Sequence, residues 1–338
     1  MRIIVDAYGG DNAPEAVLRG CRMAADQWKC EIILTGDGEK LRARAAELGV
    51  SLEDMTIADA PDVFPMEAEP TAIMKQHKDS SMARGLQMLA NGEGEAFVSA
   101  GSTGALVVGG TLIVKRIKGV KRPAIGTVVP CRGGCFMLLD SGANHDCRPE
   151  MLRQFGLMGS VYMNRVLGVK TPDVGLVNIG AEDAKGNKLV KEAYHLMSAQ
   201  TVYHFAGNCE ARDVQFGNFD VVVTDGFTGN VILKYAEGLT SVLFKQMKLA
   251  AKSSVRAKLG GLLLKPALSS LREKMNADEY GGAPLIGLEG TVVKAHGSSN
   301  DFAFGKAVEQ ARLMVLGDVT GRIREGLAEI SAGEASRV

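Results

Sequence analysis

The sequence predicts an α/β protein with a parallel sheet, and three observations in its first 60 residues predict this class. Short apolar runs at 3–5, 31–35 and, more weakly, 55–60 have the length and residue types of strands. Polar turns separate them from helical patterns at 15–25 and 39–48. Chains that alternate strand and helix in this order form parallel sheets covered by helices.

The composition fits a globular protein with a sizeable core. Of 338 residues, 46% are hydrophobic and 23% are charged, which suits one large domain or two smaller ones. Lysine plus arginine equals aspartate plus glutamate at 39 each, so the net charge does not indicate nucleic-acid binding, although it is compatible with a local basic patch. No apolar run reaches the roughly 18 residues of a membrane-spanning helix. The N-terminus begins as a strand and not as a signal peptide, so we expect a cytoplasmic protein.

Six cysteines are scattered along the chain, which favours reduced thiols over a disulfide scaffold. One group has to be weighed as a metal site, because Cys131, Cys135, His145 and Cys147 lie within 17 residues. Zinc ligands are usually paired more closely, as in C-x2-C. The glycine-containing stretch 132–134 is typical of a turn between two strands. We therefore expect ordinary thiols here, no metal and no cofactor.

The first candidate loop, 6–14, connects the first strand to the helix at 15–25. Pro14 suits the first turn of that helix. The loop contains the adjacent Gly9 and Gly10 and not G-x-G-x-x-G, so the dinucleotide-binding fingerprint is absent from its usual position.

A second candidate loop follows the fourth strand. Residues 61–70 contain three prolines and predict a surface loop, and a helix is expected at 74–91. A strand at 96–99 then enters 100–104, Ala-Gly-Ser-Thr-Gly, before a helix of small residues. The serine and threonine could cap that helix or bind a phosphate. The loop is not a P-loop, because it lacks the Gly-Lys-Ser/Thr ending.

The middle of the chain predicts a hairpin and then further α/β units. Strands at 124–130 and 135–140 flank a short turn and should be antiparallel. A polar loop then leads to a helix at 149–167, and a strand at 174–178 leads through a polar loop to a helix that ends at 199.

Lys185 falls in that last polar loop or in the first turn of its helix. A lysine there opposes the helix dipole, which is a mild indication of function, although an exposed lysine is the commoner explanation. After a short strand at 202–205, the stretch 220–238 contains an apolar strand at 221–223, a loop and a helix that we expect to begin near Gly229. Such a loop could bind an anion at the carboxyl end of the sheet, or it could be an ordinary turn.

The segment 239–275 is helical and unlike the rest. Gly260-Gly261 and Pro266 are expected to break it into two helices. The leucines lie in 255–271, which contains no acidic residue, and six lysine and arginine residues occur between 252 and 274. This pattern favours a tip that touches an anionic bilayer through Leu259, Leu262, Leu263 and Leu264. The alternative is a hairpin buried in a dimer interface, and the two are compatible.

The chain returns to the sheet at 285–295. A glycine- and serine-rich loop, 296–300, and a helix at 302–316 follow. His296 lies where ligands are often bound, although a lone histidine is more often structural. We expect 1–330 to form a single domain, with 239–280 as a helical protrusion for dimer and membrane contact and 331–338 as a flexible tail.

Ten segments, taken together and in order, resemble the phosphate acyltransferases of bacterial membrane-lipid synthesis (the PlsX family, acyl-carrier-protein:phosphate acyltransferases). The segments are VDAYGGDNAPE, KDSSM, VSAGSTGAL, RPAIG, LDSGANHDCRPE, NIGAEDAKGN, GNCEARD, VVTDGFTGNVILK, YGGAPLIGLEG and KAHGSS. They span nearly the whole chain. Two positions depart from the family pattern, which has methionine in place of Tyr8 and asparagine in place of Ser102.

The resemblance implies a three-layer α/β/α Rossmann-like sandwich, as in the isocitrate/isopropylmalate dehydrogenase class, that forms a homodimer. It implies transfer of a long-chain fatty acyl group from acyl carrier protein to inorganic phosphate. A membrane glycerol-3-phosphate acyltransferase would take up the acyl-phosphate, so the enzyme would work at the inner face of the plasma membrane. Two other functions stay open: an NAD-linked, metal-dependent dehydrogenase of the same fold, and a non-catalytic phosphate- or lipid-binding module.

The resemblance also implies that Lys185 and Asn230 take part in catalysis. We expect the other contacts to substrate and phosphate to come from the polar loops that follow the strands. These residues are Asp6, Gly9, Gly10, Asp11, Asn12, Gly101, Ser102, Thr103, Gly104, Asn144, Asp225, Gly226, Thr228, His296, Gly297 and Ser298.

Overall fold

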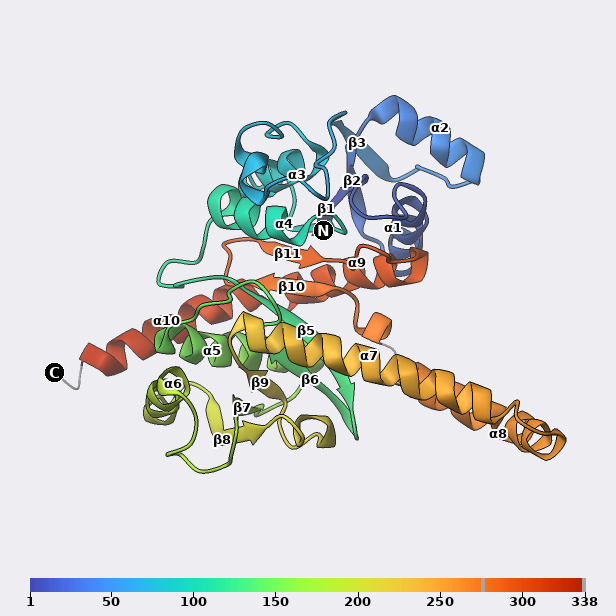
Figure 1. The fold of residues 1–338 in the computed structure, drawn as a ribbon. Helices are drawn as coiled ribbons and strands as arrows, with labels where there is room; N and C mark the ends of the chain where they lie inside the picture. The colour runs from blue at the N-terminus through green and yellow to red at the C-terminus, as the bar shows by residue number, and fades with distance from the viewer. Residues whose placement is uncertain (275–276, 336–338) are drawn as a thin grey trace.

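The computed structural model describes residues 1–274 and 277–335. This part of the chain forms one sheet of eleven strands in the order β3-β2-β1-β4-β11-β10-β5-β6-β9-β7-β8 (Figure 1). Helices pack on both faces of the sheet, as the core clusters described below show. The predicted α/β class is therefore confirmed.

The N-terminal half of the sheet is parallel throughout. Its strands are β1 (Arg2–Asp6), β2 (Glu31–Gly36), β3 (Met55–Asp59), β4 (Ala96–Ser99) and β11 (Thr291–Lys294). Helices α1 (Glu15–Trp28) and α2 (Gly38–Leu48) connect the first three strands. Because β1, β4 and β11 are neighbours and run in one direction, the loops that follow them leave the sheet side by side.

The C-terminal half contains a second parallel set that runs the other way. Its strands are β6 (Gly134–Leu139), β9 (Val221–Val223), β7 (Asp173–Asn178) and β8 (His204–Glu210). Strands β10 (Ala283–Ile286) and β5 (Ala124–Cys131) join the halves through three antiparallel pairings. The predicted hairpin around 132–134 is one of them. Because the chain direction reverses at each of these three antiparallel pairings, the carboxyl ends of the two parallel sets lie at opposite edges of the sheet, that is, at opposite ends of the strands.

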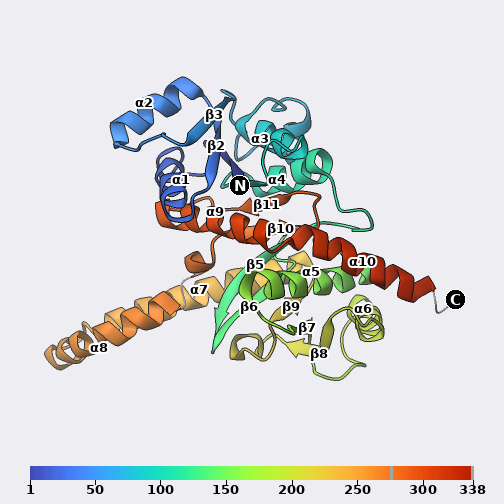
Figure 2. The ribbon, with the colours of Figure 1, turned by 180° about the vertical axis from the view of Figure 1, so that it is seen from behind.

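Alternation along the strands separates the two faces. Val5, Leu34 and Val98 pack in a cluster with α1, α5 (Pro149–Leu167), α6 (Lys188–Ala199), α9 (Asp301–Leu316) and α10 (Val319–Ala335). Ile4 and Phe97 face the opposite side, where they pack with α3 (Ser81–Ala90) and α4 (Thr103–Gly109). Figures 1 and 2 show these two helical layers from the front and from behind.

Helix α7 (Gly226–Ala250) lies on the same face as α3 and α4. On β5, Ile125 packs with the α3 and α4 cluster, and Val129, four residues on, packs with the cluster that α7 contacts through Ile232 and Leu233. Residues four apart on a strand point to the same face. The helices that begin after β4 and after β9 therefore share one side of the sheet, with β10 and β11 between them (Figure 1).

Several predicted elements have different bounds in the structure, and three of them are described here. The helix expected at 74–91 is a 3-10 turn at Pro70–Met74 followed by α3, because the Ser80 hydroxyl caps α3 by accepting the Ala83 N–H. The stretch 285–295, expected as one return to the sheet, contains parts of two antiparallel strands, β10 and β11. The strand expected at 202–205 is β8, which continues to Glu210.

Helices α7 and α8 (Val255–Lys274) form an arm that projects from the body of the molecule (Figures 1 and 2). The expected break at Gly260-Gly261 and Pro266 is wrong, because α8 runs through all three residues. The chain turns earlier, and the Ser254 hydroxyl caps α8 by accepting the Ala257 N–H. A Cβ on Gly261 would lie 3.0 Å from the Ala251 Cβ, so this glycine allows α8 to pack closely against the end of α7.

The four leucines expected to touch a bilayer, Leu259, Leu262, Leu263 and Leu264, are all exposed on α8, with Leu263 75% exposed. Arg272 and Lys274 belong to α8, but their side chains are not among those that the structure describes. Helix α10 continues through 331–335, and 336–338 lie outside the described residues. None of the described helices combines the length and apolar content that crossing a bilayer requires.

Candidate active site

Three loops meet at the carboxyl ends of β1, β4 and β11. We call residues 6–14, 99–104 and 295–300 the N-terminal loop cluster. The Asp11 N–H donates to the Gly297 carbonyl oxygen at 2.8 Å. The Asn12 side-chain amide donates to the carbonyl oxygens of Ser298 and Ser299 at 3.1 and 3.2 Å. The structure thus brings together loops that are almost 300 residues apart in the chain.

The two adjacent glycines of the first loop allow this close approach. A Cβ on Gly9 would lie 2.6 Å from the Gly101 nitrogen. Gly10 has a φ of +99°, and a Cβ there would lie 2.9 Å from the Gly297 carbonyl oxygen. Any larger residue would push the loops apart, so these glycines serve to pack one loop against the other two.

Asp6 is fully buried beneath the N-terminal loop cluster. Its carboxylate accepts the Ser81 hydroxyl at 2.6 Å and the Ser99 hydroxyl at 2.7 Å. The Ser99 oxygen also accepts the Gly101 N–H at 3.0 Å, so the network holds the start of the 100–104 loop. Burial raises the pKa of Asp6, and the two hydroxyls oppose that shift. The predicted site residues include Asp6 but neither serine.

Lys294, the last residue of β11, was missed as well. Its side chain is only 9% exposed, and its ammonium donates to the Ala100 carbonyl oxygen at 3.0 Å and to that of Ala295. Burial lowers the pKa of Lys294 to about 8, while the charges of Asp6 and Asp11 oppose the shift. The available signal was a lysine at the end of an apolar strand, directly before the 296–300 loop.

The remaining predicted residues of this cluster have local roles in the structure. Ser102 caps α4 by accepting the Ala105 N–H at 3.5 Å, whereas Thr103 is exposed. The His296 Nδ1 atom accepts the Ser298 N–H at 3.2 Å and lies 2.8 Å from the Ser298 hydroxyl. Tyr8, one of the departures from the family pattern, packs its ring against Gly36.

A second group of loops gathers at the carboxyl ends of β6, β7 and β9. We call residues 140–144, 179–187 and 224–230 the C-terminal loop cluster. The Gly226 N–H donates to the Asn144 carbonyl oxygen at 2.7 Å. A Cβ on Gly142 would lie 3.8 Å from the Asn230 Oδ1 atom. Asn144, Gly226 and Asn230, all predicted site residues, are therefore neighbours.

Asp140 organises this second cluster, although sequence reasoning did not select it. Its buried carboxylate accepts the backbone N–H groups of Gly142, Ala143 and Asn144 at 3.0, 3.0 and 2.7 Å. It also accepts the Asn144 amide at 2.8 Å and the Ile125 N–H at 3.2 Å. Burial raises the pKa of Asp140, and these donors lower it.

Helix α7 begins at Gly226, three residues before the predicted start at Gly229. Asp225 is the N-cap, and its carboxylate accepts the Thr228 N–H at 2.9 Å and the Thr228 hydroxyl at 2.8 Å. Since Gly226 and Thr228 already donate to protein groups, the first turn is less open to an anion than expected. The Asn230 side chain is exposed and has no hydrogen-bond partner among the described residues.

Lys185 lies in the loop between β7 and α6, before the Asn187 N-cap, and its side chain is exposed. Its carbonyl oxygen accepts the Asn178 amide at 3.1 Å. Strands β7 and β9 are parallel, with Leu176 opposite Val223. The loops that carry Lys185 and Asn230 therefore leave the sheet at the same edge.

The two clusters are not joined by a hydrogen bond or ion pair from Lys185 or Asn230 in the part of the chain that is described. One packing contact brings them closer. Ala143 of the C-terminal loop cluster packs against the core cluster that contains Ala105 and Leu106 of α4, the helix that begins after the 100–104 loop. The two clusters thus border the same face of the sheet, on which α4 and α7 lie.

The cysteines weighed as metal ligands lie apart. Cys131 and Cys135 lie on the β5–β6 hairpin, whereas the Cys147 thiol donates to the Asn144 carbonyl oxygen at 3.5 Å. No group of three or more candidate metal ligands occurs within residues 1–274 and 277–335. Burial, with the charges of Asp140 and Asp225, raises the pKa of Cys147 to about 12. This thiol stays protonated at neutral pH and is therefore a poor nucleophile.

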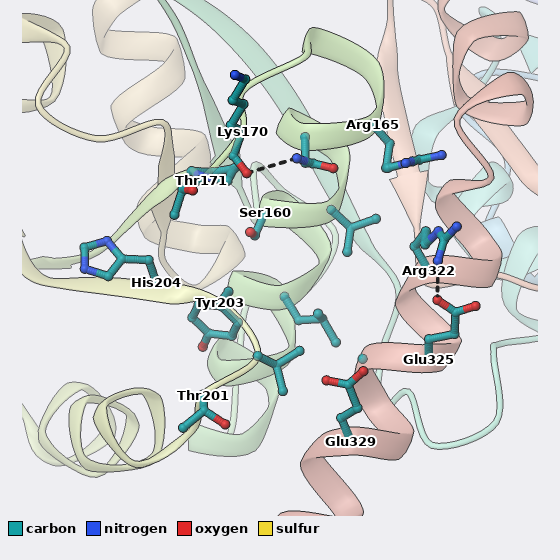
Figure 3. Close-up of a pocket in the computed structure, with 16 residues that line it drawn as sticks. Ser160, Arg165, Lys170, Thr171, Thr201, Tyr203, His204, Arg322, Glu325 and Glu329 are labelled. Atoms are coloured by element: carbon teal, nitrogen blue, oxygen red, sulfur yellow. Dashed lines mark hydrogen bonds and ion pairs between the residues drawn. The ribbon is translucent and has the colours of Figure 1, made fainter.

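A pocket of about 890 Å³ lies away from both clusters. Its lining includes Lys170, His204, Arg322 and Glu325, from the starts of β7 and β8 and from α10 (Figure 3). It contains none of the predicted site residues. The charges offset one another, since Arg322 pairs with Glu325 at 2.8 Å. We therefore place the candidate site at the two loop clusters and not in this pocket.

The chain matches a family model described as a fatty acid synthesis protein over residues 1–322. It is 44% identical over 332 residues to a phosphate acyltransferase of Clostridium acetobutylicum, covering 98% of this chain and 100% of that protein. It is 45% identical over 326 residues to a phosphate acyltransferase of Caldicellulosiruptor bescii, covering 96% and 98% of the two chains.

Two solved structures are similar in fold. A phosphotransacetylase from Streptococcus pyogenes has a TM-score of 0.65 at 16% identity, covering 95% of this chain and 94% of that one. A 4-hydroxythreonine-4-phosphate dehydrogenase from Klebsiella pneumoniae has a TM-score of 0.53 at 14% identity, covering 93% and 99%. At these identities the likeness concerns the fold alone, and it is compatible with a Rossmann-like α/β sandwich.

Proposed function

Because this chain belongs to the phosphate acyltransferase family, and is therefore an enzyme that transfers an acyl group to phosphate, we propose that its donor is a long-chain fatty acyl thioester of acyl carrier protein. The product is an acyl-phosphate for phospholipid synthesis, which a membrane glycerol-3-phosphate acyltransferase then takes up. The observation that supports this most is an exposed lysine and an exposed amide, Lys185 and Asn230, on loops that leave the sheet at the same edge.

The reaction is a direct displacement at the thioester carbonyl. A phosphate oxygen attacks the carbonyl carbon and forms the new C–O bond. The C–S bond breaks, and its electron pair leaves with the sulfur of the carrier protein. Phosphate is already an anion at neutral pH, so the enzyme has little proton abstraction to perform. It has to orient the two reactants and offset the negative charge that develops on the carbonyl oxygen.

Lys185 and Asn230 suit that task. In our proposal the Asn230 amide donates to the thioester carbonyl oxygen, and the Lys185 ammonium offsets the charge of the phosphate or of the developing oxyanion. Both side chains are exposed, and their loops leave the sheet at the same edge. An exposed amide without a protein partner can donate to a substrate without first breaking a bond.

The N-terminal loop cluster holds the phosphate in this proposal, through the hydroxyls and backbone N–H groups of 101–104 and 296–298. The N–H groups of Gly101 and Ser298 are excepted, because they already donate within their own loops. Asp6, Asn12 and the two glycines shape these loops from behind. Asn144, Asp225, Gly226 and Thr228 frame Asn230, since each takes part in the hydrogen bonds around the start of α7.

Direct transfer needs no acyl-enzyme. Cys147, which touches Asn144 in the C-terminal loop cluster, is held as a thiol by burial and by two carboxylates. A thiol with a raised pKa does not compete with phosphate for the thioester.

We propose that the α7–α8 arm serves both a homodimer and the membrane surface. The apolar side chains of Val231, Tyr235 and Val242 are exposed along α7, on a face that a second copy would cover. The exposed leucines of α8, with Lys258 and Lys265 beside them, would rest on the anionic inner face of the plasma membrane. The same basic side chains could receive the acidic acyl carrier protein.

The decisive experiment measures phosphate-dependent release of free carrier protein from long-chain acyl-carrier protein by the purified protein. We expect release that saturates with phosphate and equals the acyl-phosphate formed. Absence of release would show that the thioester donor is not acyl carrier protein. We also propose that the fold belongs to the isocitrate/isopropylmalate dehydrogenase subclass, and a parallel assay with NAD and a hydroxy acid should give no reduction.

A further inference from the structure

Lys294 is the only lysine buried within the described part of the chain, and it lies directly beneath the loops assigned to phosphate. We propose that Lys294 is a positioning residue whose ammonium ties the 100–104 loop to the 295–300 loop and so sets the affinity for phosphate. This inference rests on the proposed function, because it takes the N-terminal loop cluster as the phosphate site.

The geometry links one side chain to both loops. The ammonium donates to the carbonyl oxygen of Ala100, directly before Gly101, and to that of Ala295, directly before His296. In a trans peptide the N–H of the next residue points away from the carbonyl oxygen. The bond to Ala295 therefore turns the His296 N–H away from the lysine, toward the outside of the cluster. An ammonium has three N–H donors, and the third has no acceptor among the described residues.

The charge of the cluster requires such a group. The three loops contain two aspartates, Asp6 and Asp11, and no lysine or arginine. The His296 Nδ1 atom is engaged within its own loop, where it accepts the Ser298 N–H. Without Lys294, phosphate would meet two carboxylates and no fixed positive charge. With Lys294 in place, a cation lies behind loops whose carbonyl oxygens point inward toward it.

The same lysine also interacts electrostatically with the Asp6 carboxylate. Asp6 and Lys294 attract each other, and both are buried, so their interaction is screened less than a surface pair would be. Asp6 in turn holds Ser99, which accepts the Gly101 N–H. A change at Lys294 therefore reaches the 100–104 loop by two routes, through the Ala100 carbonyl and through Asp6.

The test compares the steady-state kinetics of Lys294→Met with the wild type. Losing a charge-assisted contact of this kind should raise the KM for inorganic phosphate roughly ten- to a hundredfold. The KM for acyl-carrier protein and the kcat at saturating phosphate should change by less than about threefold, because Lys294 does not belong to the thioester site. The matched control is Lys306→Met, a partly buried lysine on α9 that pairs with Glu309, and it should leave the KM for phosphate unchanged.

An unchanged KM for phosphate in folded Lys294→Met would overturn the inference, as would a loss confined to kcat. If the variant does not fold, the wild type still provides a test. Its KM for phosphate should rise as the pH increases above about 8, where Lys294 loses its proton. The titratable groups near it are Asp6 on β1, Asp11 in the next loop and His296, and burial raises the pKa of Asp6. A flat profile there would count against the inference.

A binding measurement separates this inference from the proposed function. Inorganic phosphate should raise the melting temperature of the wild-type protein and raise that of Lys294→Met much less. If the wild type neither binds nor consumes phosphate, the proposed function fails. If the wild type binds phosphate and Lys294→Met binds it equally well, only the role of Lys294 fails.

Discussion

The two loop clusters are built in opposite ways. In the N-terminal loop cluster the charged groups that shape the site, Asp6 and Lys294, are buried and the loops are bonded to one another. In the C-terminal loop cluster the frame is buried around Asp140, but Lys185 and Asn230 stand exposed. A small anion of fixed shape suits a rigid site, whereas a thioester carried on a protein arrives from solvent. Under the proposed function, the difference between the clusters would match that difference between the two substrates.

The largest expected effect concerns the exposed side chains of the C-terminal loop cluster. Asn230→Ala should lower kcat by two to three orders of magnitude, because losing one oxyanion donor costs roughly 3–4 kcal/mol in comparable enzymes. The KM for phosphate should stay nearly constant, since the N-terminal loop cluster is intact. Steady-state kinetics with acyl-carrier protein would measure both, with Asn218→Ala, another exposed asparagine, as control. Normal turnover in folded Asn230→Ala would remove the residue from the mechanism.

The buried frame of the C-terminal loop cluster should respond in stability. Asp140→Asn replaces one of two acceptor oxygens by a donor that faces N–H groups, so we expect the free energy of unfolding to fall by about 2–3 kcal/mol. Urea unfolding would measure it. Asp225→Asn is the matched control, because asparagine is also a good N-cap and should cost only a few tenths of a kcal/mol. Equal losses in the two variants would show that Asp140 is no more than another surface cap.

In the N-terminal loop cluster, the buried Lys294 should make the free energy of unfolding depend on pH. Its pKa is about 8 in the folded chain and 10.5 ordinarily, so between these values the unfolded chain holds a proton that the folded chain has released. The contribution of Lys294 to the free energy of unfolding is therefore fully present above its ordinary pKa. It is lost as the pH falls through the pKa that Lys294 has in the folded chain. Relative to Lys294→Met, the wild type should gain about 3 kcal/mol in free energy of unfolding between neutral pH and the ordinary pKa. A constant difference across urea titrations in that range would mean that Lys294 is not held in a low-dielectric site.

The α7–α8 arm differs from both clusters, because the leucines at its tip are exposed and no buried network of described residues supports them. Leu263→Glu places a charge among exposed leucines and should weaken binding to anionic liposomes about tenfold or more. Leu112→Glu, at a 54% exposed leucine in the body of the molecule, should leave binding unchanged. Sedimentation with vesicles would measure both. Unaltered liposome binding together with a loss of dimer would show that these leucines face a second copy.

The smallest effect concerns the thiol of the C-terminal loop cluster. Cys147→Ser should change kcat by less than about twofold, because its raised pKa keeps the thiol out of the chemistry. Mass spectrometry of the wild type during turnover should show no acylated cysteine. A trapped acyl-enzyme at this position would contradict direct transfer.

Local signals in the sequence predicted much of the fold. The turn at 132–134 predicted the β5–β6 hairpin, and the alternation of apolar runs with polar turns predicted the parallel units on either side of it. Capping residues set the bounds that were missed. Ser80 starts α3 later than the helical pattern suggested, and Asp225 starts α7 earlier, because a side-chain acceptor fixes the first turn more strongly than the apolar pattern does.

A different reason explains why sequence reasoning did not find Lys294, Ser81 and Asp140. Lys294 and Ala100 are 194 positions apart, and Ser81 reaches Asp6 across 75 positions. Contacts of this kind exist only once β11 has paired with β4 beside β1, and no local pattern records that pairing. Asp140 was missed for a related reason, since its importance comes from burial beneath α7. The order of the strands, and not the motifs alone, decides which polar side chains lie beneath the loops.

Helix α7 has one consequence for how the enzyme would deliver its product. A single continuous helix carries Asn230 in its second turn and ends at the tip of the arm, and its 25 residues span roughly 37 Å. If the tip of the arm rests on lipid, this rod holds the reaction at a fixed height above the bilayer. A long-chain acyl-phosphate released there would have only a short distance to cross through water before it reaches the bilayer. The short path would limit its hydrolysis.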